Sequence, residues 1–382
     1  MHSIQSIPDP GGMRAAARVC CMSKRIVLTG GGSAGHVTPN LALVPGLEEA
    51  DIEAHYIGTE SGIEQQLVRG TLPYHVIQAG KLRRYLSREN ISDIFRTLRG
   101  LREARDTLQE IQPDLVFAKG GYVSVPVVYA AHRLRIPVIL HESDYTPGLA
   151  NRLCGRYATK TCLTFEPEKG LKPGQILTGS PVRAELLNGS RERGLELAGF
   201  DGQKPVLLIM GGSLGAEAVN KAVDAALPRL LERCDVIHLR GRGHLNPALS
   251  GTAGYRQYEY IGEELPDIYR AADAALSRAG ANAVFEFAAL ALPALLIPLP
   301  LSASRGDQIL NAGYFERNGY AMVLDQDKMT EDTLTAGLDA LLKNADTLRR
   351  NMKNAPSLNG TKNVLEVILN ELQQASPASQ RG

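Results

Sequence analysis

The chain contains the same local pattern twice, once in each half. An apolar strand-like run, a glycine-rich turn and a helical segment occupy residues 25–36 (RIVLTGGGSAGH), and the same order recurs at residues 205–216 (PVLLIMGGSLGA). This order opens a Rossmann-like unit, because glycine permits the tight turn that brings the helix back onto the sheet. Two openings predict two Rossmann-like domains. Since ligands of such folds bind beyond the carboxyl ends of the strands, we expect a cleft where the two sheets face each other.

Short runs rich in Val, Ile and Leu alternate with helix-length segments along the rest of the chain. The strand-like runs are residues 25–29, 53–57, 115–118, 137–140, 205–210, 235–239, 273–277 and 293–298. The helix-length segments are residues 90–109, 213–232, 306–318 and 331–342. This alternation is typical of an α/β fold with a parallel sheet covered on both faces. We expect Pro45 to bend or end the helix that follows the first glycine turn, because proline removes a hydrogen bond.

Composition excludes several classes of protein. The net charge of +1 disfavours a nucleic-acid binder, so any recognition of anions must be local. Aromatic residues make up only 5% of the chain and Trp is absent, which disfavours base stacking. The five cysteines are scattered without a CxxC pair, as expected for free thiols in a reducing cytoplasm. The longest apolar run, residues 287–301, contains three prolines and is too short and broken to cross a bilayer.

The first glycine turn, residues 30–36 (GGGSAGH), ends in a titratable side chain. Free backbone N–H groups in such a turn can hold an anion, and His36 at the cleft edge is suited to proton transfer. The glycines alone are equally compatible with a simple strand-to-helix connection that binds nothing, and His36 makes this alternative less favoured.

The second glycine turn, residues 211–215 (GGSLG), does not match GxGxxG, so a dinucleotide cofactor is not expected. Its N–H groups and the Ser213 hydroxyl suit a diphosphate at a helix start. Further on, we expect Glu286 near the start of the helix that follows residues 277–282. There it would accept hydrogen bonds from ribose hydroxyls or only favour the helix dipole.

Two charged segments have competing interpretations. Residues 81–105 contain eight basic side chains against three acidic ones, with apolar residues at helical spacing. This predicts either a helix packed on the sheet with a solvated basic face or a patch attracted to anionic lipid, for which Lys81, Arg83, Arg84 and Arg88 are the candidates. Asp325 and Asp327 match the DxD pattern that binds a metal in some glycosyltransferases, but a solvated loop or helix cap is the preferred interpretation.

A series of motifs, in order, resembles one enzyme family. The motifs are GGGSAGHVTPNLAL, GTESGIE, AGKLRRY, KGGYVSVPVVYAA, IPVILHESDYTPGLAN, LTGSPVR, MGGSLGA, SRAGANAVFE and LLIPLPLSASRGDQILNA. From about residue 24 to 370 the chain resembles the MurG family, the peptidoglycan-precursor N-acetylglucosaminyltransferases. The resemblance implies the two-domain GT-B architecture and transfer of N-acetylglucosamine, with inversion, from UDP-GlcNAc to the 4-hydroxyl of the MurNAc of lipid I (undecaprenyl-diphospho-MurNAc-pentapeptide). The product is lipid II, made by a peripheral enzyme on the cytoplasmic face of the inner membrane.

The resemblance also implies partners, cofactors and a division of the chain. No metal or other cofactor is expected, and cell-wall synthesis and division proteins are candidate partners. Residues 1–23 are expected to form a flexible extension, and residues 24–180 the N-terminal acceptor and membrane-associating domain. Residues 181–355 would bind UDP-GlcNAc, and residues 356–382 would form a helix returning to the first domain and a flexible tail.

The family's motifs imply a first set of donor contacts. Ser33, Ala34 and Gly35 match the loop beside the donor sugar and the acceptor diphosphate. Arg183 and Ser213 match residues that contact the donor diphosphate. With no metal, these groups and the helix N-termini would stabilise the negative charge of the departing UDP.

A second set would bind the nucleoside and the sugar. Ile261 matches the residue whose backbone contacts the uracil edge, Glu286 the ribose-binding acid, and Gln308, beside Asp307, a glutamine near the donor sugar. Asp144 departs from the family, since many members have Asn at this position. A carboxylate accepts hydrogen bonds from sugar hydroxyls but cannot donate as an amide does.

Two residues are candidates for the base that deprotonates the acceptor hydroxyl. We prefer His36, whose ordinary pKa leaves the imidazole largely neutral at cytoplasmic pH, and Glu142 is the alternative. Three other functions fit the same sequence: a glycosyltransferase acting on diacylglycerol, a UDP-GlcNAc epimerase of the same architecture, and a non-catalytic nucleotide-sugar-binding subunit.

Overall fold

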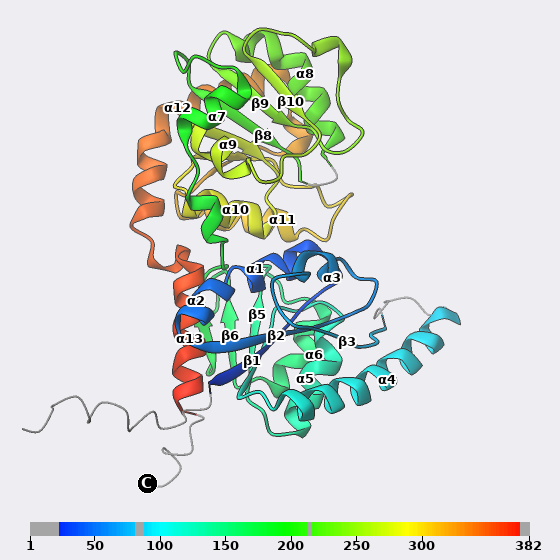
Figure 1. The fold of residues 1–382 in the computed structure, drawn as a ribbon. Coiled ribbons are helices and arrows are strands. Elements are labelled where there is room, and N and C mark those ends of the chain that lie inside the picture. Colours follow the sequence, from blue (N-terminus) through cyan, green and yellow to red (C-terminus); the bar gives the residue numbers. More distant parts are fainter. Residues whose placement is uncertain (1–22, 81–87, 213–214, 375–382) are drawn as a thin grey trace, which may run out of the picture.

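The computed structural model describes residues 23–80, 88–212 and 215–374, which form two α/β domains, each with one parallel sheet (Figure 1). The first sheet has the strand order β3-β2-β1-β4-β5-β6-β7, and the second has the order β10-β9-β8-β11-β12-β13. All strand pairs are parallel. The prediction of two Rossmann-like domains is therefore confirmed, with β1 and β8 as the central opening strands.

The elements of the first domain alternate strand and helix. Its strands are β1 (Lys24–Thr29), β2 (Ile52–Gly58), β3 (Tyr74–Val76), β4 (Leu115–Ala118), β5 (Val138–Glu142), β6 (Lys160–Leu163) and β7 (Gln175–Leu177). Its helices are the 3₁₀ turn η1 (Ala34–His36), α1 (Thr38–Leu41), α2 (Val44–Glu49), α3 (Ile63–Val68), α4 (Arg88–Ile111), α5 (Ser124–Arg133) and α6 (Leu149–Cys154).

The second domain repeats the alternation. Its strands are β8 (Val206–Met210), β9 (Asp235–Leu239), β10 (Tyr255–Tyr258), β11 (Ala274–Ser277), β12 (Ala294–Leu296) and β13 (Met322–Val323). Its helices are α7 (Arg191–Ala198), α8 (Glu217–Leu231), α9 (Leu265–Ala271), α10 (Ala281–Ala289), α11 (Asp307–Arg317) and α12 (Glu331–Lys353), with the 3₁₀ turns η3 (Ala184–Leu187) before α7 and η5 (Gln326–Lys328) before α12. The last helix, α13 (Gly360–Gln374), follows them.

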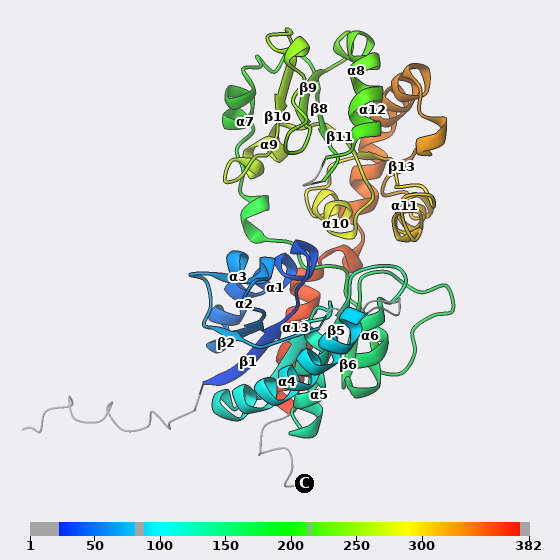
Figure 2. The same cartoon turned by 90° about the vertical axis from the view of Figure 1, so that its right-hand side faces the viewer.

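The last helix completes the core of the first domain. Successive residues of β1 alternate between the two faces of its sheet, as the two-residue period of a strand requires. Ile26 and Leu28 pack on one face with Val364 and Ile368 of α13, whereas Val27 packs on the other face with residues of α4 and α5. Figures 1 and 2 show α13 running along the first domain after the chain has crossed back from the second.

Several details differ from the sequence prediction. The helix after the first glycine turn is divided into α1 and α2, with Pro45 in the first turn of α2, as expected of proline. The helix predicted for residues 213–232 begins only at Glu217, and the one predicted to end at residue 342 continues to Lys353. Five short strands, β3, β6, β7, β10 and β13, were not predicted, because their sequences (YHV, KTCL, QIL, YRQY and MV) lack the longer apolar runs that mark the predicted strands.

The loops that follow the carboxyl ends of the two sheets face each other, as predicted. Asn282 of α10 donates to the Thr38 hydroxyl of α1 across 3.4 Å. The Tyr145 N–H, after β5, donates to Asn311 Oδ1 of α11, also across 3.4 Å. These contacts place η1, α1 and the β5–α6 loop opposite α10 and α11 (Figure 1).

Candidate active site

Two buried side chains that the sequence analysis did not identify hold the first glycine turn. The Tyr56 hydroxyl donates to the Gly30 carbonyl at 2.7 Å. The Glu64 carboxylate accepts from the Gly32 N–H at 3.2 Å and from the Thr59 hydroxyl at 2.5 Å. Hydrogen bonds within the protein therefore hold the backbone of the turn in place without a ligand.

His36 lies at the end of this turn with one ring nitrogen engaged. Its Nδ1 is 3.2 Å from the Gly31 carbonyl and 3.0 Å from the Ser33 hydroxyl. Because a carbonyl can only accept, we assign the ring proton to Nδ1, which leaves the lone pair on Nε2. Burial, followed by the positive charge of Lys119, lowers the pKa of His36 to about 4. The imidazole is neutral at pH 7, as a base requires.

The other predicted residues of this turn lie at the surface that faces the second domain. Ser33 and Ala34 are exposed and Gly35 is half-buried. A Cβ atom on Gly35 would lie 3.5 Å from Nδ2 of Asn282, so this residue faces α10 directly. The turn is therefore placed to contact a ligand shared by the two domains.

Glu142, the alternative base, ends β5, and its carboxylate accepts hydrogen bonds from the loop that follows and from α6. Its oxygens accept from the N–H of Asp144 at 3.1 Å, the N–H of Gly148 at 3.2 Å and the Asn151 amide at 2.9 Å. Burial raises the pKa of Glu142 against the effect of these hydrogen bonds. The arrangement favours a role in shaping residues 143–148 over proton transfer.

Asp144 lies on the loop after β5, in a mixed electrostatic environment. Burial raises the pKa of Asp144, the charge of Asp307 on the second domain raises it further, and Lys119 and Asn311 oppose this. The Thr146 hydroxyl, on the same loop, donates to Asp307 Oδ1 at 2.5 Å. Asp144 and Asp307 therefore approach the same region from opposite domains.

A buried lysine lies beneath the first glycine turn and was missed by the sequence analysis. Lys119 directly follows β4 and is 0% exposed. Its Nζ lies 2.6 Å from Nδ1 of His141 on β5, and His141 Nε2 lies 2.9 Å from the Gly179 carbonyl. Lys119 is part of the KGGYVS motif, but lysine is normally exposed, so sequence alone gave no sign of its burial.

In the second domain, Glu286 is oriented by a tyrosine. The Tyr269 hydroxyl of α9 donates to Glu286 Oε2 at 2.7 Å. Burial raises the pKa of Glu286, and the hydrogen bond from Tyr269 and the charge of Arg183 oppose this. The prediction that Glu286 lies near a helix start is wrong: α10 begins at Ala281, so Glu286 is in its second turn and the helix dipole does not explain it.

Arg183 precedes η3 in the segment that connects the domains. Its Nε atom is buried and has no hydrogen-bond partner within the part of the chain that the structure describes. A buried guanidinium N–H without an acceptor is costly, so this donor is suited to an anionic ligand. The charge of Arg183 also opposes the rise in the pKa of Glu286 that burial causes.

Ile261 and Gln308 are the remaining predicted donor-binding residues of the second domain that the structure describes. Ile261 is buried between β10 and α9, and neither its N–H nor its carbonyl takes part in a hydrogen bond within the described residues. Its backbone can therefore pair with a ligand. Gln308, the second residue of α11, accepts from the Leu299 N–H at 3.1 Å through Oε1, which fixes the orientation of its amide.

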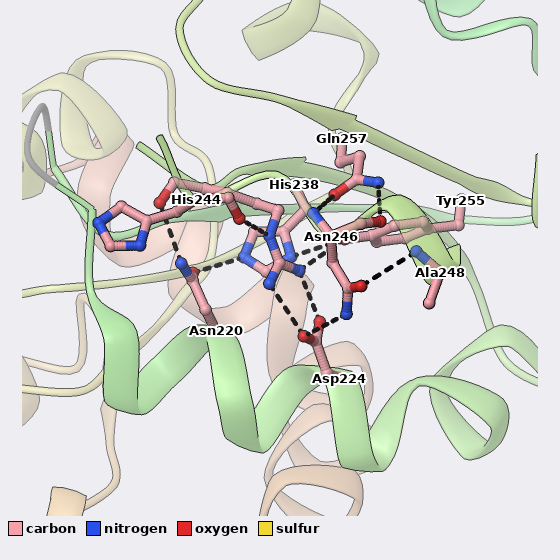
Figure 3. A network of polar contacts seen from close by, with 9 residues as sticks. Asn220, Asp224, His238, His244, Asn246, Ala248, Tyr255 and Gln257 are labelled. Carbon is pink, nitrogen blue, oxygen red and sulfur yellow. Dashed lines mark hydrogen bonds and ion pairs between the residues drawn. The ribbon is translucent and has the colours of Figure 1, made fainter. Parts of the chain in front are cut away.

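The second glycine turn is supported by a polar network (Figure 3). Ser213 lies outside the described residues, but Gly215 packs so closely on the Arg240 carbonyl that a Cβ atom would collide with it. Arg240 is nearly fully buried and donates to both oxygens of Asp224 on α8, at 2.5 and 2.9 Å. His238 of β9 contacts Asn220 Oδ1, and Asn220 donates to the Arg240 carbonyl, both at 3.0 Å. These contacts fix residues 240–246 against the turn.

The basic segment is only partly described. Lys81, Arg83 and Arg84 lie outside the described residues, and Arg88 is known only as the first residue of α4. The C-terminal half of α4 buries Ala104, Leu108 and Ile111 against the core, as the packed-helix interpretation predicts. Leu98, in contrast, is 56% exposed.

The DxD pair lies on the surface. Asp325 directly precedes η5 and Asp327 is its middle residue; both are exposed, and Asp325 forms an ion pair of 2.9 Å with Lys328. Within the described ranges, no group of three His, Cys, Asp or Glu side chains is arranged to hold a metal ion. Within the same ranges, no helix combines the length and apolar character needed to cross a membrane.

Comparison with known proteins identifies the class. The sequence model of the glycosyltransferase family 28 N-terminal domain matches residues 26–163, and that of the C-terminal domain matches residues 206–368. The fold is similar to a crystal structure of MurG from Acinetobacter baumannii, with a TM-score of 0.70 and 28% identity over 91% of this chain and 99% of that one. These matches define a glycosyltransferase of the GT-B architecture, as predicted.

Two curated relatives narrow the family. One from Clostridium botulinum is 48% identical over 353 residues, 92% of this chain and 99% of its own. One from Lachnoclostridium phytofermentans is 50% identical over 348 residues, 90% of this chain and 98% of its own. Both carry the name UDP-N-acetylglucosamine--N-acetylmuramyl-(pentapeptide) pyrophosphoryl-undecaprenol N-acetylglucosamine transferase. The chain belongs to this family, the MurG family predicted from its motifs.

More distant structures share only the fold. A calicheamicin glycosyltransferase, CalG4, has a TM-score of 0.68 at 16% identity over 93% of this chain and all of that one. A protein from Listeria monocytogenes that is named a "putative UDP-N-acetylglucosamine 2-epimerase" has a TM-score of 0.66 at 14% identity over 94% of this chain and 98% of that one. The architecture alone therefore does not distinguish transfer from epimerisation.

Proposed function

We propose that the chain transfers N-acetylglucosamine from UDP-GlcNAc to the 4-hydroxyl of the MurNAc of lipid I, with inversion at the anomeric carbon, forming lipid II for peptidoglycan. The observation that carries this proposal is identity of 48% over 353 residues with a relative named for that transfer. The described part of the chain supports it, because the residues matched to the family's donor contacts come from both domains, and these domains contact each other through α1 and the β5–α6 loop on one side and α10 and α11 on the other.

The second domain is assigned to the donor. Glu286, held by Tyr269, accepts hydrogen bonds from the ribose hydroxyls, and the free backbone of Ile261 pairs with the uracil edge. Arg183 donates its unpartnered Nε–H to the diphosphate, together with the Ser213 hydroxyl. A guanidinium positioned before reaction stabilises the charge that develops on departing UDP without further reorganisation.

The first domain is assigned to the acceptor and the proton. Inversion requires in-line attack at C1 by a hydroxyl that loses its proton. His36 accepts this proton at Nε2, because Nδ1 is held by the Gly31 carbonyl and the ring is neutral at cytoplasmic pH. Ser33, Ala34 and Gly35 border the reacting sugars, and Asp144 and Gln308 contact the donor sugar from opposite domains.

We place the enzyme at the cytoplasmic face of the inner membrane as a peripheral protein. Its lipid-linked acceptor requires access to that surface, and Lys81, Arg83, Arg84 and Arg88 are assigned to anionic headgroups. The exposed Leu98 on α4 supports an apolar contribution to the same contact. Proteins of cell-wall synthesis and division remain the candidate protein partners.

The test is transfer from labelled UDP-GlcNAc to a lipid I analogue, with and without EDTA. We expect labelled lipid II in both conditions. If EDTA abolishes transfer and magnesium restores it, the interpretation of Asp325 and Asp327 as metal ligands would be favoured instead. Matched incubations without acceptor, or with diacylglycerol, test the other functions. Epimerised UDP-sugar, labelled glycolipid, or UDP binding without any product would each contradict the proposal.

A further inference from the structure

Arg240 directly follows β9 and is a buried residue to which the proposed mechanism gives no role. Its Nη1 and Nη2 donate to the two oxygens of Asp224 on α8, at 2.5 and 2.9 Å. Its Nε donates to the His244 carbonyl at 2.6 Å. Because each guanidinium nitrogen already has an acceptor inside the protein, Arg240 is suited to hold other groups in place rather than to bind a substrate.

Arg240 also belongs to a closed cycle of hydrogen bonds (Figure 3). Nδ2 of Asn220 donates to the Arg240 carbonyl, so Oδ1 of Asn220 is left to accept from His238 Nε2, at 3.0 Å. Nδ1 of His238 then carries the lone pair and accepts from the Tyr255 hydroxyl at 3.0 Å. The Tyr255 oxygen accepts in turn from Arg240 Nη1 at 3.1 Å. Each residue donates once and accepts once within the cycle, so the cycle has a single direction.

The protonation states of the cycle maintain this direction. Burial, followed by the charge of Arg240, lowers the pKa of His238 to about 3, although Asp224 acts in the opposite direction. His238 is therefore neutral at pH 7 and can accept at Nδ1. Burial raises the pKa of Tyr255 against the effect of Arg240, so the hydroxyl keeps the proton that it donates.

The cycle fixes α8 at two points. Asn220 and Asp224 are four residues apart on α8 and therefore lie on the same face of the helix. Asn220 holds the Arg240 carbonyl, and Asp224 holds the Arg240 guanidinium. Two attachments to one residue at the end of β9 restrict both sliding and rotation of the helix. The first turn of α8 is therefore held relative to the carboxyl end of the sheet.

The second glycine turn rests on the same carbonyl. Gly215 has a φ of +80°, and a Cβ atom at this position would lie 2.4 Å from the Arg240 oxygen. No side chain of the described residues caps the start of α8, which follows the turn directly. The carbonyl that Asn220 holds thus supports both the turn and the helix start.

We propose that Asn220 and Arg240 are positioning residues for the donor diphosphate: through the cycle they hold Gly215 and the first turn of α8 in the geometry that binds it, without touching it. Backbone N–H groups that are already in place bind an anion without the cost of ordering them. The inference rests on the proposed function only in its assignment of the second glycine turn to the diphosphate.

The test compares UDP with uridine, which lacks the diphosphate. The Kd of each is measured by ligand-detected NMR for the wild type and for Asn220→Ala. This variant leaves the ion pair of Arg240 with Asp224 in place, so the domain should fold, and thermal unfolding checks this. We expect the Kd for UDP to rise about three- to tenfold, as for the loss of one or two hydrogen bonds. The Kd for uridine should stay within about twofold of the wild-type value.

Tyr255→Phe opens the same cycle on its far side, and Tyr258→Phe is the matched control. Both tyrosines lie on β10, but the Tyr258 hydroxyl donates to the Leu197 carbonyl, at 3.1 Å, outside the cycle. Tyr255→Phe should raise the Kd for UDP about two- to threefold, and Tyr258→Phe should leave it unchanged. If Asn220→Ala does not fold, Tyr255→Phe supplies the test.

The outcomes separate this inference from the proposed function. Wild-type affinity for UDP in both Asn220→Ala and Tyr255→Phe would overturn the inference. Equal losses for UDP and uridine would also overturn it, because the cycle would then support the whole domain rather than the turn. UDP binding does not require transfer, so the expected pattern in a protein that forms no lipid II would support the inference and contradict the proposed function. A wild type that does not bind UDP would contradict both.

Discussion

The hydroxyl of Thr146 in the first domain donates a hydrogen bond of 2.5 Å to Asp307, the first residue of α11 in the second domain. With Asn282–Thr38 and Tyr145–Asn311, it joins the loops that follow the carboxyl ends of the two sheets. The described arrangement is therefore one in which the domains touch at the proposed reaction site.

Removing this hydrogen bond should weaken the contact between the two domains more than it lowers the free energy of unfolding. We expect Thr146→Val to raise the donor KM about two- to fivefold and to leave kcat within about twofold, because the variant loses only ground-state binding. Steady-state kinetics and thermal unfolding check this. Thr146→Ser is the control, since it keeps the hydroxyl. If the donor KM of Thr146→Val equals that of the wild type, the hydrogen bond between Thr146 and Asp307 does not contribute to donor binding.

Glu286 should determine donor affinity. Glu286→Ala removes the acceptor of the Tyr269 hydroxyl and the proposed ribose contacts, so we expect the donor KM to rise about tenfold or more. It should also cost about 1–3 kcal/mol of stability, because the buried Tyr269 hydroxyl loses its partner. Tyr269→Phe separates the two effects, because it leaves the carboxylate in place. Normal donor KM in Glu286→Ala would remove Glu286 from the site.

His36→Ala should lower kcat by about 10²–10⁴ with little change in UDP affinity. In the wild type, the acid limb of kcat/KM should lie near pH 4, well below the ordinary imidazole value, because burial and Lys119 lower the pKa of His36. The variant should lack this limb. If His36 instead donates to an acceptor phosphate, the mutation would mainly raise the lipid I KM. Near-normal kcat with the limb intact would transfer the role of base to Glu142.

Lys119 should make stability depend on pH in a defined direction. The lowered pKa of Lys119 means that the folded protein binds fewer protons than the unfolded chain between about pH 7 and 10.5. The free energy of unfolding therefore rises with pH across this window. It falls as the pH is lowered, because the buried Lys119 must then take up a proton. Urea unfolding at about pH 7, 8 and 9 checks this. The free energy of unfolding of the wild type, measured relative to that of Lys119→Met, should rise with pH. A constant difference would contradict the buried titration.

Charge reversal should weaken membrane association. We expect Arg83→Glu, Arg84→Glu and Arg88→Glu together to reduce binding to anionic vesicles, since each cation near such a surface contributes about 1 kcal/mol. Binding by the wild type should also weaken as salt is added. Sedimentation with vesicles measures both.

The control for this triple variant lies in the other domain. It changes three exposed basic residues of α12, Lys343, Arg350 and Lys353, to Glu. This matches the change in net charge without touching the basic segment. Equal vesicle binding by the two triple variants at low salt would show that only net charge matters, and that the basic segment is a solvated helix face.

The sequence predicted the central strands because their continuous apolar runs are independent of context. It missed edge strands such as β7, which is only three residues long and half-buried along its length. Glu286 was placed two residues too close to the helix start, because residues 277–282 were all taken as the preceding turn, whereas α10 already begins at Ala281. Lys119 could not be identified as buried, since its environment depends on His141, 22 residues away, and on the sheet that brings them together. The sequence near each glycine turn shows which residue types lie there. The charge states of these residues depend on neighbours that only the folded sheet brings together.

The return of α13 to the first domain has a consequence for how the protein is made. Val364, Ile368 and Leu372 complete the apolar core around β1, yet they are among the last described residues of the chain. On the ribosome, the first domain emerges early but must wait, with this face of its sheet uncovered, until the whole second domain has been synthesised. Its uncovered face is a natural binding surface for a chaperone during that interval, and a nascent chain stalled before residue 360 should expose it to protease.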